Sequence, residues 1–336
     1  MRASLEHGLR GQLQQRRDAL TTTISEVGEA EDLVRLLQEV DGALARLGTD
    51  DFGLCRMCGE RFYDDELLAQ PMKQYCLCSL TEEQQAALQR DLDLAWRVQV
   101  SLLPDRILSY GDWEVHSRYQ PAGPVSGDYC DVVTNGANDG WIYFLVGDVS
   151  GKGVAAAYVA AYLSALVRTT LETPVPVVDV VERLNSYLSN AASSSHFITL
   201  VCGRADATGH VEICNAGHCP PMVVRRTGVL RVDSSGFPLG IEHGDSYDKC
   251  SLDLSMGESL VLYTDGITEA RNSSDSMYGA NALQDVLAAS RAATPVRLAD
   301  ACLRDLESFR SGAPRTDDVT LMVVRRGGTW TVSGAG

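Results

Sequence analysis

Residues 144–157, FLVGDVSGKGVAAA, decide the fold, because an apolar run ends there on Asp148 and a Gly-Lys-Gly turn opens a second apolar run. A phosphate-binding P-loop needs four residues between its first glycine and the Gly-Lys pair, and then Ser or Thr. Here three residues separate Gly147 from Gly151, and Gly153 follows Lys152. The stretch therefore predicts a strand ending near Asp148, a glycine turn and a helix, and it does not predict a nucleotide loop.

Other aspartates stand in similar places, at strand boundaries beside small residues. They are Asp128 in SGDYCDV, Asp265 in LVLYTDG and the pair Asp317-Asp318 in RTDDVTL. Clustered carboxylates repel one another unless they are protonated or bridged by cations, and sites made only of oxygen suit magnesium or manganese. Two such cations can activate a water for attack on phosphorus. We therefore expect hydrolysis of phosphate esters.

After about residue 113 the sequence consists of short β-like runs separated by turns, which indicate strands. Helical patterns interrupt them at about 153–171, 176–190, 278–290 and 295–309. Helices and strands arrive in blocks, which predicts an α+β domain built on antiparallel sheets. The expected strands are WEVHSRY, GDYCDVVT, WIYFLVGDV, FITLVCGRAD, GHVEICNAG, PPMVVRR, YDKCSLDL, ESLVLYTDG and DVTLMVVRR.

The N-terminal third has a different texture. Leucine and alanine recur at helical spacing over about residues 4–50, and a break near SEVGEAED, residues 25–32, predicts a helical hairpin. A further helix is expected from Thr81 to Leu103, before Pro104. We therefore divide the chain into residues 1–80, a linker or dimerisation helix at 81–104, a catalytic domain at 105–328 and a tail at 329–336.

Four of the ten cysteines, Cys55, Cys58, Cys76 and Cys78, lie in one short stretch, whereas the other six are scattered. This spacing argues against a disulfide framework and favours a metal. Cys55 and Cys58 form a C-x2-C pair, and seventeen residues separate Cys58 from Cys76. We expect one zinc ion held by four thiolates, with a metal-free fold packed by Phe52, Leu54 and Tyr75 as the alternative.

Composition limits the partners. Acidic residues outnumber basic ones 45 to 29, so the formal net charge is −16. Such a surface repels nucleic acid and anionic membranes. No stretch is long and apolar enough for a membrane span, and the N-terminus lacks the apolar core of a signal peptide. We therefore expect a cytoplasmic protein that binds neither nucleic acid nor membrane.

A series of motifs over about residues 96–326 resembles the PPM (PP2C-like) serine/threonine phosphatases of the bacterial RsbU and SpoIIE type. The motifs include WEVHSRYQPAGPVSGDYCDV, VGDVSGKGVAAA, NAGHCPPMVV, LVLYTDGITEARN and TDDVTLMVVR. The resemblance implies a β-sandwich of two antiparallel sheets flanked by helices, with two manganese or magnesium ions at one end. It also implies a phosphoprotein serine/threonine phosphatase that acts through metal-activated water.

The resemblance assigns roles by motif. Asp148 would bridge both ions with help from the backbone carbonyl of Val149, and Asp265 and Asp317 would hold one ion. Asp128 would bind a metal or its water and, with Asp148, form the catalytic pair. The supporting positions would be Asp318, Gly147, Gly151 and Lys152.

Some positions depart from the family pattern. Eukaryotic relatives carry a histidine, a candidate general acid, where this chain has Ser150, so no general acid is assigned. Arg118 and Lys152 are candidates for contact with the substrate phosphate, and either can instead be a solvated charge. His218 in NAGHCPP is expected to order a turn and not to bind metal.

Residues 30–79 resemble the zinc finger of the TraR/DksA family, which follows a helical hairpin. The family's second C-x2-C would place cysteine at position 79, where this chain has Ser79, so Cys78 comes one residue early. The resemblance leaves two functions open for this part: binding of RNA polymerase, or a regulatory and dimerisation platform, which we favour.

Three functions follow for the whole chain. The first is a phosphatase acting on a phosphorylated anti-sigma-factor antagonist of the STAS type, in a homodimer paired through the N-terminal and linker helices. The second is an inactive phosphatase scaffold, and the third is a transcription regulator. The seam expected to pair in the linker helix is Leu88, Leu92, Ala95, Gln99 and Leu102.

Overall fold

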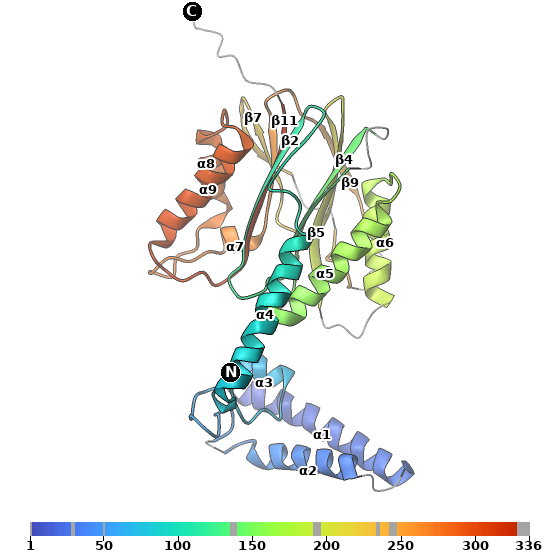
Figure 1. Ribbon diagram of the computed structural model, residues 1–336, viewed down its shortest axis with the longest axis vertical. Coiled ribbons are helices and arrows are strands. Elements are labelled where there is room, and N and C mark those ends of the chain that lie inside the picture. Colours follow the sequence, from blue (N-terminus) through green and yellow to red (C-terminus); the bar gives the residue numbers. More distant parts are fainter. Residues whose placement is uncertain are drawn as a thin grey trace, which may run out of the picture. The chain divides into compact units, whose positions relative to one another are not determined.

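The computed structural model describes residues 2–27, 31–49, 51–134, 140–190, 196–232, 236–241 and 247–327. The chain forms two compact units, Met1–Asp91 and Leu92–Gly336 (Figure 1). None of the described helices is long and apolar enough to cross a membrane. The expected tail at 329–336 lies outside the described residues, and the division at 80, 104 and 328 remains a prediction.

The first unit begins with the expected helical hairpin. Helix α1 spans Arg2–Val27 and α2 spans Glu31–Arg46. Apolar residues of both helices, such as Leu9, Leu13 and Val40, are fully buried in a core that also contains Phe52. The chain then turns through the cysteine-rich segment, which contains α3 (Asp64–Ala69) and the 3-10 turn η1 (Leu77–Ser79).

Helix α4, Glu82–Leu102, follows the cysteine-rich segment and carries the expected linker pattern. One residue of the expected pairing seam has a different role. Gln99 is buried, and its side-chain amide donates to the Ser126 carbonyl at 2.6 Å and accepts from the Ser126 N–H at 3.0 Å. Gln99 of the seam therefore has a partner within the same chain. Its amide pairs with both the N–H and the carbonyl of Ser126, as a residue of a neighbouring strand would.

Two antiparallel sheets form the second unit, as the sequence predicted. The first has the order β1-β2-β11-β10-β7-β8, and the second has the order β3-β4-β5-β6-β9. The strands are β1 (Ile107–Tyr110), β2 (Trp113–Gln120), β3 (Asp128–Thr134), β4 (Trp141–Val149), β5 (Ile198–Asp206), β6 (His210–Ala216), β7 (Met222–Arg225), β8 (Gly228–Arg231), β9 (Lys249–Asp253), β10 (Ser259–Tyr263) and β11 (Val319–Arg326).

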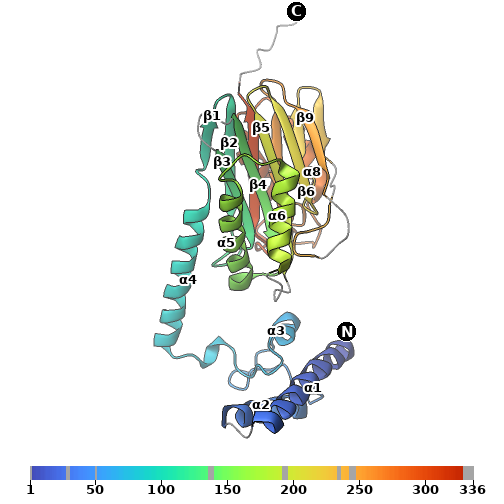
Figure 2. The same cartoon turned by 90° about the vertical axis from the view of Figure 1, so that its right-hand side faces the viewer.

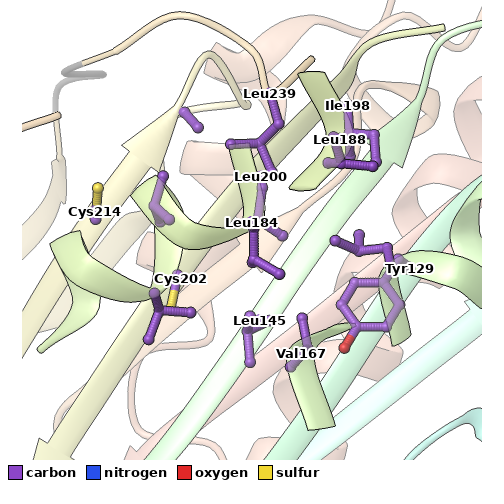
Figure 3. Packing of buried hydrophobic residues seen from close by; sticks show 14 of the residues in the cluster. Tyr129, Leu145, Val167, Leu184, Leu188, Ile198, Leu200, Cys202, Cys214 and Leu239 are labelled. Carbon is purple, nitrogen blue, oxygen red and sulfur yellow. The ribbon is translucent and has the colours of Figure 1, made fainter. Parts of the chain in front are cut away.

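Strand β4 shows how the core is layered. Its even-numbered residues, such as Phe144 and Val146, pack between the two sheets with Leu262 and Met322. Its odd-numbered residues, such as Leu145, face the opposite way into the cluster shown in Figure 3. Side chains alternate between the faces of a strand, so β4 contributes to two apolar layers at once.

Helices cover the outer face of each sheet. Figure 2 shows α5 (Gly153–Thr170) and α6 (Val177–Asn190) over the sheet that contains β4, where Val167 and Leu184 are buried. Helices α8 (Gly279–Ala289) and α9 (Pro295–Arg310) pack on the other sheet, where Leu298 and Leu321 share a core. The short helix α7, Asp265–Thr268, follows β10.

The nine expected strands and the helices of the α+β domain are confirmed to within a few residues. The sequence analysis did not anticipate β1, β8, α3 or α7. Each of these has only four to six residues. Periodicity needs a longer window than that, so such elements leave little signal in the sequence.

Candidate metal centre

Strands β3 and β4 bring Asp128 and Asp148 together. The two residues are direct partners in the antiparallel register, so their side chains lie on the same face of the sheet. Both stand at even positions, in line with Phe144 and Val146, and that face is the one turned toward the other sheet. The sandwich therefore holds two carboxylates side by side at the end of these strands.

The turn after Asp148 depends on glycine. Gly151 and Gly153 have φ angles of 93° and 75°, in the left-handed region that glycine adopts without strain. Phe197, the residue before β5, holds this turn through two hydrogen bonds. The Ser150 N–H donates to the Phe197 carbonyl at 2.9 Å, and the Ser150 Oγ accepts from the Phe197 N–H at 2.9 Å. Helix α5 then starts at Gly153, so Asp148 remains at the rim of the sheet.

The second sheet supplies the remaining carboxylates. Asp265 opens helix α7 directly after β10, and Asp317 and Asp318 directly precede β11. The two segments approach closely at Gly266, where a Cβ atom would lie 1.8 Å from the Asp318 carbonyl oxygen. A residue with a side chain would separate Asp265 from Asp317 and Asp318, so glycine permits this part of the cluster.

Asp318 ties the loop before β3 to the start of β11. Its Oδ1 accepts from the Ala122 N–H at 2.7 Å, and its Oδ2 accepts from the Gly127 N–H at 3.0 Å. Both oxygens are therefore already bound to backbone donors. This carboxylate therefore holds the segment that leads into Asp128.

Asp128 is almost fully buried, at 3% exposure, and is held by two hydroxyl groups. The Thr264 Oγ1 donates to its Oδ2 at 2.9 Å, and the Thr320 Oγ1 donates to the same atom at 2.5 Å. Burial, and then repulsion from Asp148, raises the pKa of Asp128 well above its usual range. These hydroxyls partly offset the burial of a carboxyl group.

The carboxylates interact with one another. Burial, and then repulsion from Asp265, Asp317 and Asp318, raises the pKa of Asp148 to about 7. The pKa of Asp265 is also raised, first by burial and then by Asp317. Lys152 opposes these effects: its Nζ donates to the Asp317 Oδ2 at 3.2 Å and to the Thr316 carbonyl at 2.7 Å. One ammonium group thus partly compensates several acidic ones.

The donor set fits hard divalent cations. It contains carboxylate oxygens and, beside them, the carbonyl of Val149, which lies 3.1 Å from the place where a Cβ on Gly127 would be. Magnesium and manganese favour such all-oxygen sites. Within the described part of the chain, these carboxylates do not form a group of three with all ligand atoms inside 4.8 Å.

A comparison with protein families then decides the family. Residues 138–327, more than half of the chain, match the family model described as Stage II sporulation protein E (SpoIIE). The chain belongs to the SpoIIE family. Asp148, Asp265 and Asp317 lie within the matched residues, whereas Asp128 and the cysteine cluster precede them.

Curated relatives and a solved structure agree with this family. The chain is 26% identical to protein IcfG of Synechocystis over 70% of its own length and 41% of IcfG. It is 25% identical to phosphoserine phosphatase RsbU of Bacillus subtilis over 72% of each chain. The PP2C phosphatase domain of SpoIIE from Bacillus subtilis, with a fragment of its regulatory domain, aligns with a TM-score of 0.57 at 23% identity, covering 63% of each chain. The SpoIIE-family chain thus has the PP2C fold, and its match spans less than half of IcfG.

One residue singled out from the sequence, Arg118, lies away from the carboxylates of this SpoIIE-family domain. Arg118 is next to Tyr119, which pairs with Thr320, so Arg118 projects from the opposite face of β2. There it forms an ion pair of 2.6 Å with Asp300 of α9. The structure therefore does not bring Arg118 to the carboxylate cluster, because neighbouring residues on a strand face opposite ways.

His218 orders a turn, as the sequence analysis expected. Asn215 closes a turn around it, accepting from the His218 N–H at 2.8 Å and donating to its carbonyl at 3.1 Å. The His218 Nδ1 lies 2.7 Å from the Thr199 Oγ1. Burial lowers the pKa of His218 to about 4, so the imidazole is neutral at pH 7.

Several residues near the site were missed from the sequence. Thr264, Thr320 and Gln99 contact Asp128 or the loop before it, and the His196 ring lies 3.3 Å from the place where a Cβ on Gly151 would be. Their only sequence signal is a place beside a predicted site strand, shared by many residues. Their roles depend on contacts between segments that are far apart in the chain.

The cysteine cluster is a separate and compact group. The sulfur atoms of Cys55, Cys58, Cys76 and Cys78 all lie within 4.8 Å of one another. Two of the distances are 3.6 Å, between Cys55 and Cys78, and 3.5 Å, between Cys58 and Cys76. Tetrahedral zinc with Zn–S bonds of about 2.3 Å places sulfurs about 3.8 Å apart, so this donor set fits zinc.

Backbone N–H groups surround these sulfurs despite the early position of Cys78. Cys55 Sγ accepts from the Met57 and Cys76 N–H groups at 3.4 and 3.3 Å, and Cys76 Sγ accepts from the Cys78 N–H at 3.3 Å. The N–H of Cys58 contributes most to lowering the pKa of Cys55 to about 6. A thiolate is the form that binds metal, so this environment favours Cys55 as a ligand, whereas the pKa values of Cys58 and Cys78 are raised in the metal-free cluster, that of Cys78 first by the Cys76 side chain.

Proposed function

We propose that this SpoIIE-family chain is a metal-dependent protein serine/threonine phosphatase that uses two manganese or magnesium ions. The observation that carries the proposal is the register pair Asp128–Asp148, coupled to Asp265 and Asp317 between the sheets of a PP2C fold. When bound, such cations lower the pKa of water and polarise a phosphoryl group.

The proposed ligands follow the order of the cluster. Asp148 would bridge the two ions, Val149 would contribute its carbonyl, and Asp265 and Asp317 would hold one ion. Asp128 would bind beside Asp148, oriented by the hydroxyls of Thr264 and Thr320. The alternative of an inactive scaffold is disfavoured, because each expected carboxylate is present and the fold brings them together.

Other residues position this cluster and leave room for a substrate. Asp318 holds the loop that leads into Asp128. Gly147 lets β5 approach, since a Cβ there would lie 2.8 Å from the Thr199 carbonyl oxygen. Gly151 shapes the turn, and Lys152 reaches Asp317 with an ammonium group that is otherwise exposed. Lys152 can move from Asp317 to a substrate phosphate when cations occupy the carboxylates.

We further propose that the substrate is a phosphoserine or phosphothreonine on a regulatory protein, of the anti-sigma-factor antagonist type. The support is the relative RsbU, whose name gives it as a phosphoserine phosphatase. The net charge of −16 argues against a nucleic-acid substrate.

The test is hydrolysis of para-nitrophenyl phosphate and of a phosphoserine peptide, with and without manganese. We expect manganese-dependent turnover that falls by about a hundredfold to a thousandfold in Asp148→Asn, because one electrostatic contribution at such a site is worth about that much. Asp285→Asn, which alters an exposed carboxylate on α8, should leave the rate unchanged. Equal rates with and without metal, or in Asp148→Asn and the wild type, would disprove the proposal.

The compact sulfur group supports a second proposal, that the cysteine module binds one zinc ion. Metal analysis of the purified chain should find about one zinc per chain. Cys55→Ser should lose it, and Cys250→Ser, at an exposed cysteine of β9, should retain it. Zinc retained by Cys55→Ser would contradict this assignment.

We also propose a homodimer that uses the exposed apolar residues of α4. Leu94 and Val98 are 54% and 53% exposed and lie one turn apart on the helix. Their exposure favours them over Gln99, which Ser126 occupies. Leu94→Asp with Val98→Asp should shift the mass measured by light scattering from dimer to monomer, and an unchanged mass would exclude this pairing.

A further inference from the structure

A cavity of about 460 Å³ lies in the first unit, beside the cysteine cluster and apart from the carboxylate site. Its lining includes three basic residues, Arg46, Arg56 and Lys73, and one acidic residue, Asp51. The chain as a whole has a net charge of −16, so a basic cavity stands out from its surroundings. Cavities of this size accommodate small molecules.

The fold of the cysteine module brings these cations together. Arg46 is the last residue of α2, and Arg56 lies in the turn between Cys55 and Cys58. The Arg56 N–H donates to the Gln74 carbonyl at 2.9 Å, which joins the two halves of the module next to Lys73. The three basic residues therefore come from three different segments and converge on one cavity.

The guanidinium of Arg46 is not compensated. Its Nη2 is buried and finds no hydrogen-bond acceptor among the residues that the structure describes. Burial, and then repulsion from Arg56, lowers the pKa of Arg46. Lys73 differs, since it forms a 2.7 Å ion pair with Glu66 and lies over the ring of Phe62. A buried donor without an acceptor is unfavourable, and an anion in the cavity would relieve both the missing bond and the repulsion.

The three basic side chains have a simpler alternative role, as counter-charges for the four cysteine thiolates. The hydrogen bonds of the sulfurs argue against this role. Cys55 Sγ accepts from the Met57 and Cys76 N–H groups at 3.4 and 3.3 Å, and Cys76 Sγ accepts from the Cys78 N–H at 3.3 Å. Backbone N–H groups of the cysteine turns thus bind the sulfurs, which leaves the Arg46 and Arg56 side chains available to a ligand.

We propose that this cavity binds a small molecule through its phosphate group, with Arg46 and Arg56 as the main ligands. Guanidinium groups form paired, charge-assisted hydrogen bonds with phosphate oxygens. The two arginines supply two positive charges, which match a phosphate dianion better than a carboxylate, whereas Lys73 is already paired with Glu66. The cavity also has an apolar wall at Phe52 and Leu54, against which the rest of an organic phosphate can pack.

Titration of the full chain with inorganic phosphate or pyrophosphate tests the proposal. The zinc-loaded protein is used in an Asp148→Asn background without manganese or magnesium, so that the carboxylate site contributes little. We expect saturable binding by calorimetry that Arg46→Gln and Arg56→Gln each weaken at least tenfold. Arg61→Gln changes an exposed arginine of the same module that does not line the cavity, and it should bind as the parent does.

Zinc content is measured in every variant, because it separates the two roles of the arginines. Unchanged zinc with weakened phosphate binding supports the proposal. Loss of zinc in both Arg46→Gln and Arg56→Gln would overturn it, since the cations would then serve the thiolates. Absence of saturable binding, or equal weakening in Arg61→Gln, would overturn it as well. Pyrophosphate binding without inorganic phosphate binding would assign the cavity to larger phosphate esters or anhydrides.

Discussion

The sulfur cluster of the first unit and the carboxylate cluster of the second are both candidate metal sites, but they are built differently. The four sulfurs lie within 4.8 Å of one another, on two turns that pack against the small apolar core of the first unit. The carboxylates come from β3, β4, the start of α7 and the segment before β11, in a sandwich that has its own apolar core. If both proposals hold, we expect metal at the sulfur site to supply folding free energy and metal at the carboxylate site to supply chemistry.

Removal of zinc gives the largest expected effect. A strong chelator should unfold the segment from Cys55 to Cys78, because structural zinc contributes on the order of 10 kcal/mol to modules of this kind. Hydrogen exchange of the full chain measures the result: protection should be lost in this segment and kept in β4 and β5. Equal loss of protection in both units would show that zinc does not specifically stabilise the segment from Cys55 to Cys78.

The two sites should also respond to pH in opposite directions. Asp148 has a folded-state pKa of about 7, above its unfolded value of about 3.9. A raised carboxyl pKa contributes stability below the unfolded value, and that contribution is lost as the pH rises through 7. Metal-free protein should therefore lose on the order of a few kcal/mol in the second unit between pH 4 and 7.

Thermal unfolding at several pH values, without added metal, measures this dependence. Asp148→Asn should flatten it, because the amide does not titrate. Zinc binding by the thiolates should weaken toward low pH, since they must be deprotonated to bind. If the second unit instead gains stability steadily from pH 4 to 7, the pKa of Asp148 is not raised in the metal-free protein.

Glycine substitutions compare the packing of the two units. Gly266→Ala places a Cβ against the Asp318 carbonyl and should destabilise the second unit by about 1–3 kcal/mol. Gly42→Ala, in α2, meets nothing within 4 Å and should stabilise the first unit by about 0.5–1 kcal/mol. Chemical denaturation of each variant gives the values. If Gly266→Ala also stabilises the protein, the close approach of Gly266 to Asp318 does not depend on glycine.

The smallest expected effect concerns the hydroxyl groups on Asp128. Thr320→Val removes a donor to its Oδ2 at nearly constant volume, which corresponds to about 1 kcal/mol. Manganese should then bind two- to tenfold more weakly, as measured from the manganese dependence of turnover. Thr320→Ser keeps the hydroxyl and should bind manganese as the wild type does. If valine and serine behave alike, the hydroxyl does not orient Asp128.

The parts of the fold that follow from local patterns were predictable from the sequence. The apolar run that begins at Trp141 places Asp148 at a strand end, and the glycine turn after it follows from residue types alone. Gln99 was assigned to a pairing seam because helical spacing shows which side chains share a face, but not what covers that face. Thr264 and Thr320 bind Asp128 across more than 130 residues of chain, and no periodicity reports such contacts.

The two apolar layers served by β4 limit which insertions and deletions the gene can tolerate. Loss of one residue before Asp148 would turn every later side chain of the strand to the other face, moving the carboxylate under α5 and the apolar residues out of place. Loss of two residues would preserve the faces but shift Asp148 by about 7 Å along the strand, away from Asp128. Related genes should therefore vary in length at the loops and keep this strand at constant length.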